Sequence, residues 1–241
     1  IFDLDLTLYG PEANIMAQIR DRIALYVEDH FQIGSVEAHE IRHRYWKKYG
    51  TTLGGLMAEH AIEPHDFLAH VHDIDFSVLT PDPVLAARIR ALPGRRIVYT
   101  NADAPYARRV LAARGLDGIF DAVYGVEHAG FRPKPERAAF ETVFALDALD
   151  PATAAMFEDD ARNLAVPHAL GMRTVHVAPS AEPAPHSQHS RHRSNRRRGG
   201  GGEDAALFSK SRHAAVASTP PSCRITIYNG VTGFNSGAGK L

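Results

Sequence analysis

Hydrophobic residues recur with a helical period through the first third of the chain. Isoleucine or valine stands at every fourth position between Ile15 and Val27, which gives a helix with one apolar stripe. A second stripe runs from Ile41 through Tyr45 to Tyr49 and favours a core position for both tyrosines. The stretches TLGGLMAEHAI and PHDFLAHVHDI add two shorter helices. Four successive helices without an intervening strand predict a small helical bundle.

After Pro81 the pattern changes to short apolar runs that alternate with helical stretches. This alternation predicts a parallel sheet with helices on both of its faces. The opening IFDLD has the character of the first strand of that sheet, so the fold is α/β, with the helical bundle inserted after this strand. The expected strands are 96–100, 121–125, 154–159 and 173–178, and the expected helices are 104–115, 135–149 and 161–171, the last broken near Pro167.

The composition changes again near Pro179. The residues that follow are rich in proline, serine, histidine, arginine and glycine and lack hydrophobic periodicity, which is typical of disorder. RITIY, at 224–228, has the character of a short strand, but the sequence offers no evident partner for it. We expect residues 179–241 to form a disordered tail outside the fold, with its basic side chains in solvent.

Charge and cysteine content narrow the functional classes. The 241 residues carry a formal net charge of −1, which does not favour a nucleic-acid or membrane partner. No apolar run in the sequence reaches the roughly 18 residues that span a bilayer. The single cysteine, Cys223, cannot form an intrachain disulfide, which fits a reducing, cytoplasmic compartment. Only two residues precede Asp3, so we expect the first strand to lack part of its front.

Polar side chains gather where the predicted strands end. Ligands bind open parallel sheets at the carboxyl ends of the strands, so we expect these side chains to meet at one edge. The set comprises Asp3 and Asp5 after the first strand, Thr100 and Asn101 after the second, Glu158, Asp159 and Asp160 after the strand at 154–159, and Lys134 at the start of a helix.

This set of side chains points to phosphate chemistry. Clustered carboxylates repel one another and are costly to bury, and a divalent cation relieves both effects. Mg²⁺ takes oxygen ligands, often one or two carboxylates together with a substrate phosphate. A carboxylate beside the ion can attack phosphorus and form an aspartyl phosphate. On an extended strand Asp5 points to the same side as Asp3, where it can protonate a leaving group and later deprotonate water.

Four motifs, in order, resemble those of the haloacid dehalogenase superfamily of phosphatases. They are DLDLT, YTNAD, Lys134 and FEDDARN, and the resemblance covers residues 1–178. It implies that Asp3 is the nucleophile and a Mg²⁺ ligand, and that Asp5 is the acid/base with its backbone carbonyl on the metal. It also implies that the insertion is a cap that closes over the substrate. The expected domains are a Rossmann-like core at 1–10 and 80–178 and a helical cap at 11–79.

The same resemblance implies roles for the residues at the other strand ends. Thr100 and the amide of Asn101 would hold the phosphoryl oxygens, and Lys134 would neutralise the phosphoryl group and the Asp3 carboxylate. Asp159 would complete the metal site.

A narrower resemblance concerns the substrate. The combination of FDLDLTLY with YWKKYGTTLGGLM in the cap is similar to pyrimidine 5′-nucleotidases, which implies a nucleoside 5′-monophosphate as the small-molecule partner. The aromatic residues of this stretch could instead belong to the cap core, and its threonines could form a plain turn after a helix. The candidate substrate-binding residues are Trp46, Tyr49, Thr51 and Thr52.

Two positions depart from the superfamily pattern. Leu6 stands where asparagine or glycine is common, with little expected effect. Asp103 adds a negative charge near the phosphate pocket, which is expected to weaken anion binding.

The sequence leaves three functions open. The first is a Mg²⁺-dependent 5′-nucleotidase, and the second is a phosphatase for another small metabolite, such as a sugar phosphate or phosphoglycolate. The third is an inactive truncated fragment whose basic tail binds polyanions. A dehalogenase is disfavoured, because Asp5 supplies the second acid that phosphate chemistry needs. The oligomeric state is not indicated by the sequence.

Overall fold

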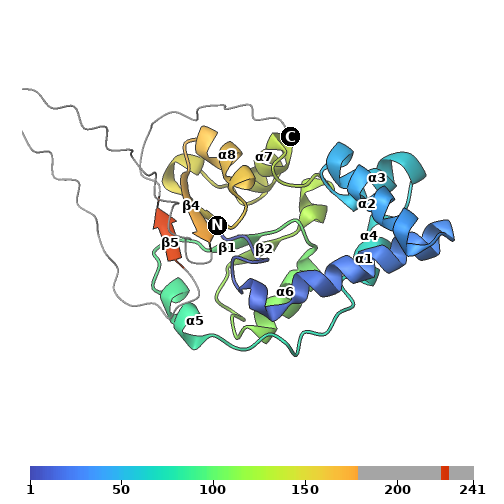
Figure 1. Cartoon of the computed structure of the whole chain (residues 1–241). Helices are drawn as coiled ribbons and strands as arrows, with labels where there is room; N and C mark the ends of the chain where they lie inside the picture. The colour runs from blue at the N-terminus through green and yellow to red at the C-terminus, as the bar shows by residue number, and fades with distance from the viewer. Residues whose placement is uncertain (179–223, 228–241) are drawn as a thin grey trace, which may run out of the picture.

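The computed structural model describes residues 1–178 and the short strand at 224–227 (Figure 1). A sheet with helices on both faces lies beside a second group of helices. The predicted α/β class, with parallel strands and a helical insertion after the first strand, is confirmed. The prediction of a disordered tail falls, apart from that short strand, outside the described residues.

The amino-terminal segment is the central strand of the sheet. Phe2 forms parallel bridges to Val98 on one side and to Phe157 on the other. Its N–H donates to the Ile97 carbonyl at 2.9 Å, and the Asp3 N–H donates to the Phe157 carbonyl at 2.9 Å. This strand is short, as expected, yet it is hydrogen-bonded on both sides. The flanking strands pair in parallel, β1 (Ile97–Tyr99) with β2 (Ala122–Tyr124) and β3 (Ala155–Glu158) with β4 (Arg173–Ala178).

A fifth strand, β5 (Arg224–Ile227), pairs with β4 in the antiparallel sense. The sequence indicated no partner for this segment, and that expectation is wrong. Without β5, β4 would be an edge strand with unpaired N–H and C=O groups, which is a template for another strand. The pairing partner could not be found from the sequence, because it lies about 50 residues away along the chain.

Alternate strand residues point to opposite faces of the sheet, and their side chains pack into two hydrophobic cores, one on each face. Phe2 and Val98 pack with residues of α5 (Pro83–Arg90), α6 (Ala104–Ala113) and the start of α1 (Ile15–Phe31). Ile97, Tyr99 and Met156 pack with residues of α7 and α8 on the other face. The covering helices are α5 (Pro83–Arg90), α6 (Ala104–Ala113), α7 (Arg137–Leu146) and α8 (Ala161–Ala169), and the short 3₁₀ turns are η1 (Pro11–Ala13), η2 (Val126–Ala129) and η3 (Pro151–Thr153).

Two helices of the core differ from the sequence pattern. The pattern does not predict α5, because only Ala86 and Ile89 of its residues are buried, and its start depends on a cap from Asp82. The pattern breaks α8 near Pro167, but the helix continues to Ala169. Because the proline lies close to the end of the helix, its missing N–H removes little of the hydrogen-bond ladder.

The four predicted helices of the insertion pack around a core of their own. Tyr45 belongs to this core and is 1% exposed, with its hydroxyl 2.6 Å from His60 Nε2. Tyr49 is half-buried at the rim, where its hydroxyl donates to the Glu59 carboxylate at 2.8 Å. These helices are α1 (Ile15–Phe31), α2 (Ser35–Tyr49), α3 (Thr52–His60) and α4 (Pro64–Val71).

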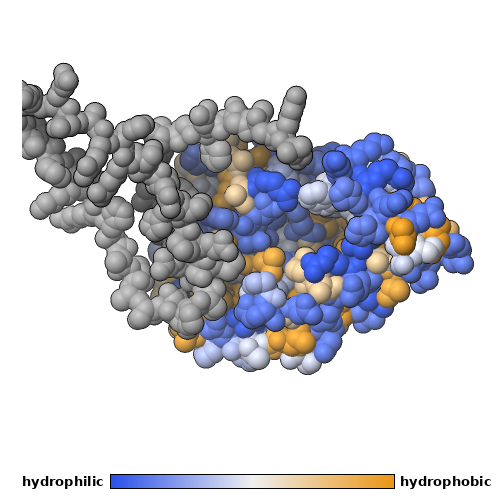
Figure 2. Space-filling view, in the orientation of Figure 1, coloured by the Kyte–Doolittle hydropathy of each residue, from blue (hydrophilic) through white to orange (hydrophobic). Residues whose placement is uncertain are grey.

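The surface of the cap is mainly hydrophilic on the face shown in Figure 2, and its apolar side chains are scattered. Val36 and Trp46 are among its exposed large apolar residues. None of the helices in the described part of the chain is both long and apolar enough to span a bilayer.

Candidate active site

Asp3 lies at the carboxyl end of the central strand. One of its oxygens is 2.7 Å from Lys134 Nζ, and the other accepts a hydrogen bond from the Thr7 hydroxyl at 3.1 Å. Burial raises the pKa of Asp3 well above its usual value, while the charge of Lys134 acts in the opposite direction. The sheet therefore delivers this carboxyl group to the edge, and a cation and a hydroxyl fix its orientation.

Lys134 is enclosed, with 1% of its side chain exposed. Its Nζ also lies 2.7 Å from Glu158 Oε2 and 3.1 Å from the Tyr99 carbonyl oxygen, so three acceptors match its three N–H groups. Burial alone would lower the pKa of Lys134, but the charges of Asp3 and Glu158 raise it above its usual value. The ammonium group therefore stays charged despite its burial.

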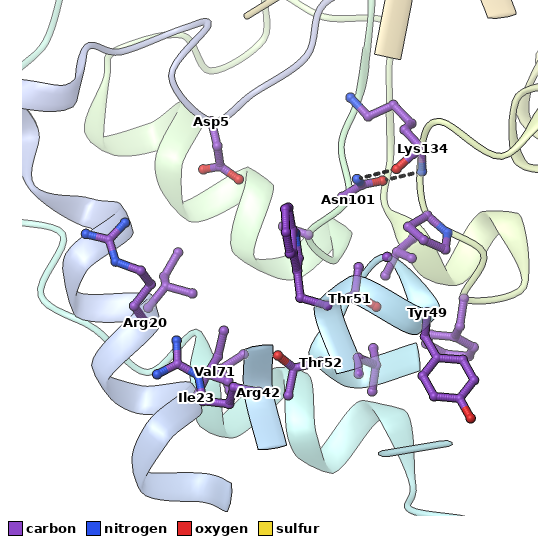
Figure 3. Close-up of a pocket in the computed structure, with 18 of the residues that line it drawn as sticks. Asp5, Arg20, Ile23, Arg42, Tyr49, Thr51, Thr52, Val71, Asn101 and Lys134 are labelled. Carbon is purple, nitrogen blue, oxygen red and sulfur yellow. Dashed lines mark hydrogen bonds between the residues drawn. The ribbon is translucent and has the colours of Figure 1, made fainter. Parts of the chain in front are cut away.

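Asn101 ties the Lys134 loop to the end of β1. Its side-chain oxygen accepts from the Lys134 N–H at 2.7 Å, and its amide nitrogen donates to the Lys134 carbonyl at 3.1 Å (Figure 3). The backbone N–H of Asn101, which the sequence assigns to a phosphoryl oxygen, has no hydrogen-bond partner among the described residues. The side chain thus positions Lys134 and leaves the backbone donor available.

Three carboxyl groups meet beside Lys134. Ligand oxygens of Asp3, Glu158 and Asp159 lie within 4.8 Å of one another. Three carboxylates and one ammonium leave a surplus of negative charge in a largely buried space, which a divalent cation would balance. Burial and the neighbouring Glu158 raise the pKa of Asp159 to about 7, which reflects the same unrelieved repulsion. These donors fit Mg²⁺, which prefers carboxylate oxygens.

Glu158 is part of this cluster although the sequence placed only Asp3, Asp5 and Asp159 at the metal. The alternation of β3 turns Glu158 inward, where it is buried against Lys134. Asp160, the third acid in the run, points elsewhere. It caps α8 and forms an ion pair with the Arg162 guanidinium at 2.6 Å.

The chain leaves the strand direction directly after Asp3. Leu6 adopts a φ of 62°, in the left-handed region, and the Leu8 N–H closes a turn on the Leu4 carbonyl at 2.9 Å. The expectation that Asp5 shares one side of an extended strand with Asp3 is therefore wrong, because Asp5 lies in this turn. Its carboxylate nevertheless forms part of the pocket wall (Figure 3).

Two tyrosine hydroxyls donate to the same oxygen of Asp5, Tyr9 at 2.5 Å and Tyr106 at 2.7 Å. Burial raises the pKa of Asp5, and these two hydrogen bonds oppose that rise. The Tyr106 ring stacks on the buried His72 ring with 4.2 Å between centroids, and His72 Nδ1 lies 2.9 Å from Asp103 Oδ1. A chain of contacts therefore joins Asp5 to the end of cap helix α4.

Comparison of the sequence with known protein families identifies the family of this chain. The model of the haloacid dehalogenase-like hydrolases matches residues 1–171. The chain belongs to this family of hydrolases. Phosphate metabolism protein 8 of Saccharomyces cerevisiae is 25% identical over 193 residues, which cover 73% of this chain. The match spans only 59% of the length of that yeast protein.

Solved structures of the same family resemble the hydrolase at low identity. L-2-haloacid dehalogenase from Xanthobacter autotrophicus is 17% identical with a TM-score of 0.45, and the match covers 72% of this chain and 74% of that one. The HAD-hydrolase YfnB from Bacillus subtilis, a structure bound to magnesium, is 15% identical with a TM-score of 0.47. That match covers 72% of the hydrolase and 85% of YfnB.

Thr100 and Asp103 flank the turn after β1 in the hydrolase. The Thr100 hydroxyl oxygen is buried and accepts from the Ala102 N–H at 3.1 Å, which leaves its proton for another acceptor. The Asp103 carboxylate caps α6 and contacts His72. Burial raises the pKa of Asp103, and the contact with His72 is the first of the effects that lower it. The lowering effects together are larger, so the pKa of Asp103 is below its usual value. The negative charge of Asp103, which the sequence analysis expected near the phosphate, therefore lies outside the pocket wall and interacts with His72.

A pocket of about 1220 Å³ lies between the cap and the sheet edge. Asp5, Asn101 and Lys134 contribute to its core side (Figure 3). Asp3 is not one of the residues that line the pocket, but it forms an ion pair with Lys134, which does line it. The cap side includes all four residues that the sequence singled out for substrate binding: Trp46, Tyr49, Thr51 and Thr52.

These cap residues differ in how they are held. Trp46 is 50% exposed, and the Arg162 guanidinium carbon from the core lies 5.7 Å from its ring centre. The Thr51 hydroxyl accepts from the Gly54 N–H at 2.9 Å and so caps α3, which is the plain structural role that the sequence left open. The Thr52 hydroxyl has no hydrogen bond within the described residues. Thr52 is therefore the freer of the two hydroxyls.

Sequence reasoning missed three residues around Asp5. Tyr9 stands within the first motif, FDLDLTLY, and its spacing from Asp5 was the available signal. Tyr106 and His72 carry no local signal, because Tyr106 is 101 positions from Asp5 in the chain and His72 contacts Asp5 only through the Tyr106 ring.

Proposed function

We propose that this hydrolase is a Mg²⁺-dependent phosphomonoesterase that acts on nucleoside 5′-monophosphates, with a preference for pyrimidine nucleotides. The observation that carries the proposal is the pairing of the Asp3 carboxylate with Lys134 inside a cluster of acids that suits a divalent cation. A second carboxyl group, Asp5, faces the pocket from the adjoining turn. Asp3 would serve as the nucleophile, Lys134 as its counter-charge and Asp5 as the proton donor.

The metal would be held by Asp3, Glu158 and Asp159, and by the Asp5 backbone carbonyl that the family resemblance adds. When bound, Mg²⁺ stabilises the negative charge on the phosphoryl oxygens. Lys134 contributes a second positive charge beside the Asp3 carboxylate. The Thr100 hydroxyl and the Asn101 backbone N–H are the further donors for the phosphoryl group at this sheet edge.

The protein side chains account for each covalent and proton step. An Asp3 oxygen attacks phosphorus, and the bond from phosphorus to the ester oxygen breaks with its electron pair on that oxygen. Asp5 gives its proton to the departing oxygen, and the burial that raises its pKa favours the protonated form. Water then attacks the aspartyl phosphate while Asp5 takes its proton. Phosphate leaves, and the Asp3 carboxylate is restored.

This reading is favoured over carbon–halogen cleavage, although dehalogenases are among the related structures. Displacing a halide from carbon requires a carboxylate nucleophile but no additional acids for a cation and no proton donor for the leaving group. Glu158 and Asp159 beside Asp3, together with the pocket-facing Asp5, are therefore better explained by phosphate transfer.

The preference for nucleotides is supported by the cap. Trp46 presents an aromatic face at the pocket, and Thr52 presents a hydroxyl without an internal partner. A base could stack on the former and hydrogen-bond to the latter. A polar site of this kind rejects a mismatched base, because a buried polar group is then left unpaired.

Phosphate release by the purified chain tests the proposal. We expect hydrolysis of p-nitrophenyl phosphate that requires Mg²⁺, and faster hydrolysis of UMP and CMP than of AMP or glucose 6-phosphate. Equal rates on the four natural substrates would leave a general phosphatase and remove the nucleotide preference. Failure to hydrolyse any phosphomonoester with Mg²⁺ present would remove the proposal itself.

A further inference from the structure

The cap side of the pocket is positively charged. Of the described residues from 11 to 79 that line the pocket, none is an aspartate or glutamate. A concave wall with charges of one sign attracts ligands of the opposite sign. The arginine, lysine and histidine side chains on this wall are Arg20, His39, Arg42, His43, Lys47, Lys48 and His72.

Within the described residues, Lys47 and both arginines of this wall have no carboxylate partner; the arginines are Arg20 on α1 and Arg42 on α2. Neither forms an ion pair or a side-chain hydrogen bond with any part of the chain that the structure describes. Lys48 differs, because its ammonium lies 2.9 Å from Glu59. A guanidinium group carries five N–H donors in a planar fork. Two guanidinium groups without acceptors therefore leave many N–H donors for a ligand.

Arg42 is the more enclosed member of the pair. It is half-buried, and its Nε is shielded from solvent without an acceptor among the described residues. Burial and then the charge of Arg20 lower the pKa of Arg42 from its usual value, while Asp21 opposes this. Both side chains line the same pocket, and the positive charge of Arg20 acts on Arg42, so an anion bound beside them would relieve this repulsion.

The arginines and the predicted phosphate site occupy different sides of the pocket. In Figure 3, Arg20 and Arg42 lie on the side formed by α1, whereas Asn101 and Lys134 lie on the opposite side of the view. Thr52 lines the same pocket. The predicted phosphate site and the arginine pair therefore belong to different parts of the pocket wall.

We propose that Arg20 and Arg42 form a second anion site in the cap, so that the preferred substrates are phosphomonoesters with a second phosphate or carboxylate group at their far end. This inference rests on the proposed phosphomonoesterase function and narrows its substrate class. A nucleoside bisphosphate is one such compound, and UMP lacks the second group. Arginine suits this role, because its fork binds phosphate and carboxylate oxygens in pairs.

Binding of non-hydrolysable ligands tests the second site without depending on turnover. Alkane-1,ω-bisphosphonates of increasing length and alkylphosphonates of the same lengths would be titrated calorimetrically into the full chain with Mg²⁺. For at least one length we expect the bisphosphonate to bind about tenfold more tightly or better, because charged hydrogen bonds are added at the second end. Two identical ends alone would give only about a twofold statistical advantage.

Substitutions assign the effect to the arginines. Arg42→Gln should reduce the advantage of the bisphosphonate to about the statistical twofold, and Arg42→Lys should restore part of it. Arg88→Gln is the matched control, because Arg88 is an exposed arginine outside the pocket wall, and it should leave the advantage unchanged. Melting temperatures of the variants check that each is folded.

The outcomes separate this inference from the proposed function. The absence of any advantage beyond the statistical one at every length, or an advantage that persists in Arg42→Gln, would overturn the second site. Hydrolysis of p-nitrophenyl phosphate, measured in parallel, reports the phosphomonoesterase function by itself. A supporting kinetic result would be a higher kcat/KM for uridine 3′,5′-bisphosphate than for UMP, with the ratio lowered in Arg42→Gln.

Discussion

The two sides of the pocket satisfy their charges in opposite ways. At the sheet edge, Lys134 is enclosed and has an acceptor for each of its N–H groups, and Asp3 is held on both oxygens. On the cap side, Arg42 is half-buried and has no acceptor within the described residues. Hydrogen bonds of Asp3 and Lys134 that form before a ligand arrives fit a reaction centre that must be rigid. Donors left without partners fit recognition, because a ligand can supply what is missing.

The two sides also differ in how the chain builds them. The sheet edge combines residues from the amino-terminal strand, the ends of β1 and β3 and the loop before α7. The cap side comes mainly from α1 and α2. We therefore expect substitutions at the edge to affect chemistry on every substrate, and substitutions on the cap to change the ranking of substrates.

The largest effect is expected from Asp3→Asn. An amide cannot form the phosphoryl-enzyme, so hydrolysis of p-nitrophenyl phosphate should fall below the detection limit while the melting temperature changes little. Stopped assays for released phosphate would measure it. If the variant kept more than about a tenth of the wild-type kcat, Asp3 would not be the nucleophile.

Lys134→Met should be both inactive and unstable. The change leaves the Asp3 and Glu158 carboxylates facing each other without their shared cation, which should cost about 3–5 kcal/mol of unfolding free energy. Urea denaturation measures this cost. Adding Glu158→Gln to the same chain should recover part of it, because one of the two carboxylates is removed. An unchanged midpoint for Lys134→Met would contradict the description of this ion pair.

Tyr106→Phe should have a smaller effect that depends on the leaving group. It removes one of two hydrogen bonds that orient Asp5, so alkyl phosphates, which need a proton donor, should lose about tenfold in kcat. p-Nitrophenyl phosphate, with its stable leaving group, should lose much less. Tyr124→Phe is the matched control, because the Tyr124 hydroxyl binds Asp147 away from this site. Equal losses on both kinds of substrate would indicate a merely structural role for Tyr106.

The smallest effects are expected in the cap, and they separate two neighbouring threonines. Thr52→Val should lower the ratio of kcat/KM for UMP to that for p-nitrophenyl phosphate several-fold, because only the nucleotide would use the hydroxyl. Thr51→Val should leave this ratio unchanged and cost about 1 kcal/mol of stability, because its hydroxyl caps α3. The reverse pattern would show that Thr51 reads the base and that Thr52 supports the fold.

Sequence reasoning predicted the fold and the sheet edge well, because both leave local signals. The alternation of apolar strands and helices gives the parallel sheet, and the carboxyl ends of its strands bring Asp3 and Asp159 together, with Lys134 from the loop before α7. The motifs also carried the superfamily assignment, which the family match confirms. Their catalytic roles remain predictions for the experiments above.

Features that depend on long-range packing were not predictable in the same way. The partner of β5 could not be inferred, because a short strand can pair with any open sheet edge. The turn at Leu6 redirects Asp5, and no periodic pattern marks it. Tyr106, on α6, binds Asp5 although the two residues are 101 positions apart in the chain. Residues with unremarkable sequence contexts therefore complete the surroundings of an obvious motif.

The most direct test of the account compares two reactions of the same purified chain. Phosphate release from p-nitrophenyl phosphate and chloride release from L-2-chloropropionate would be measured with Mg²⁺ and again with excess EDTA. We predict phosphate release that needs Mg²⁺ and is lost in Asp3→Asn, with no chloride release under either condition. Chloride release that persists in EDTA, without phosphate release, would contradict the assignment of Asp3, Asp5 and the acidic cluster to phosphomonoester hydrolysis.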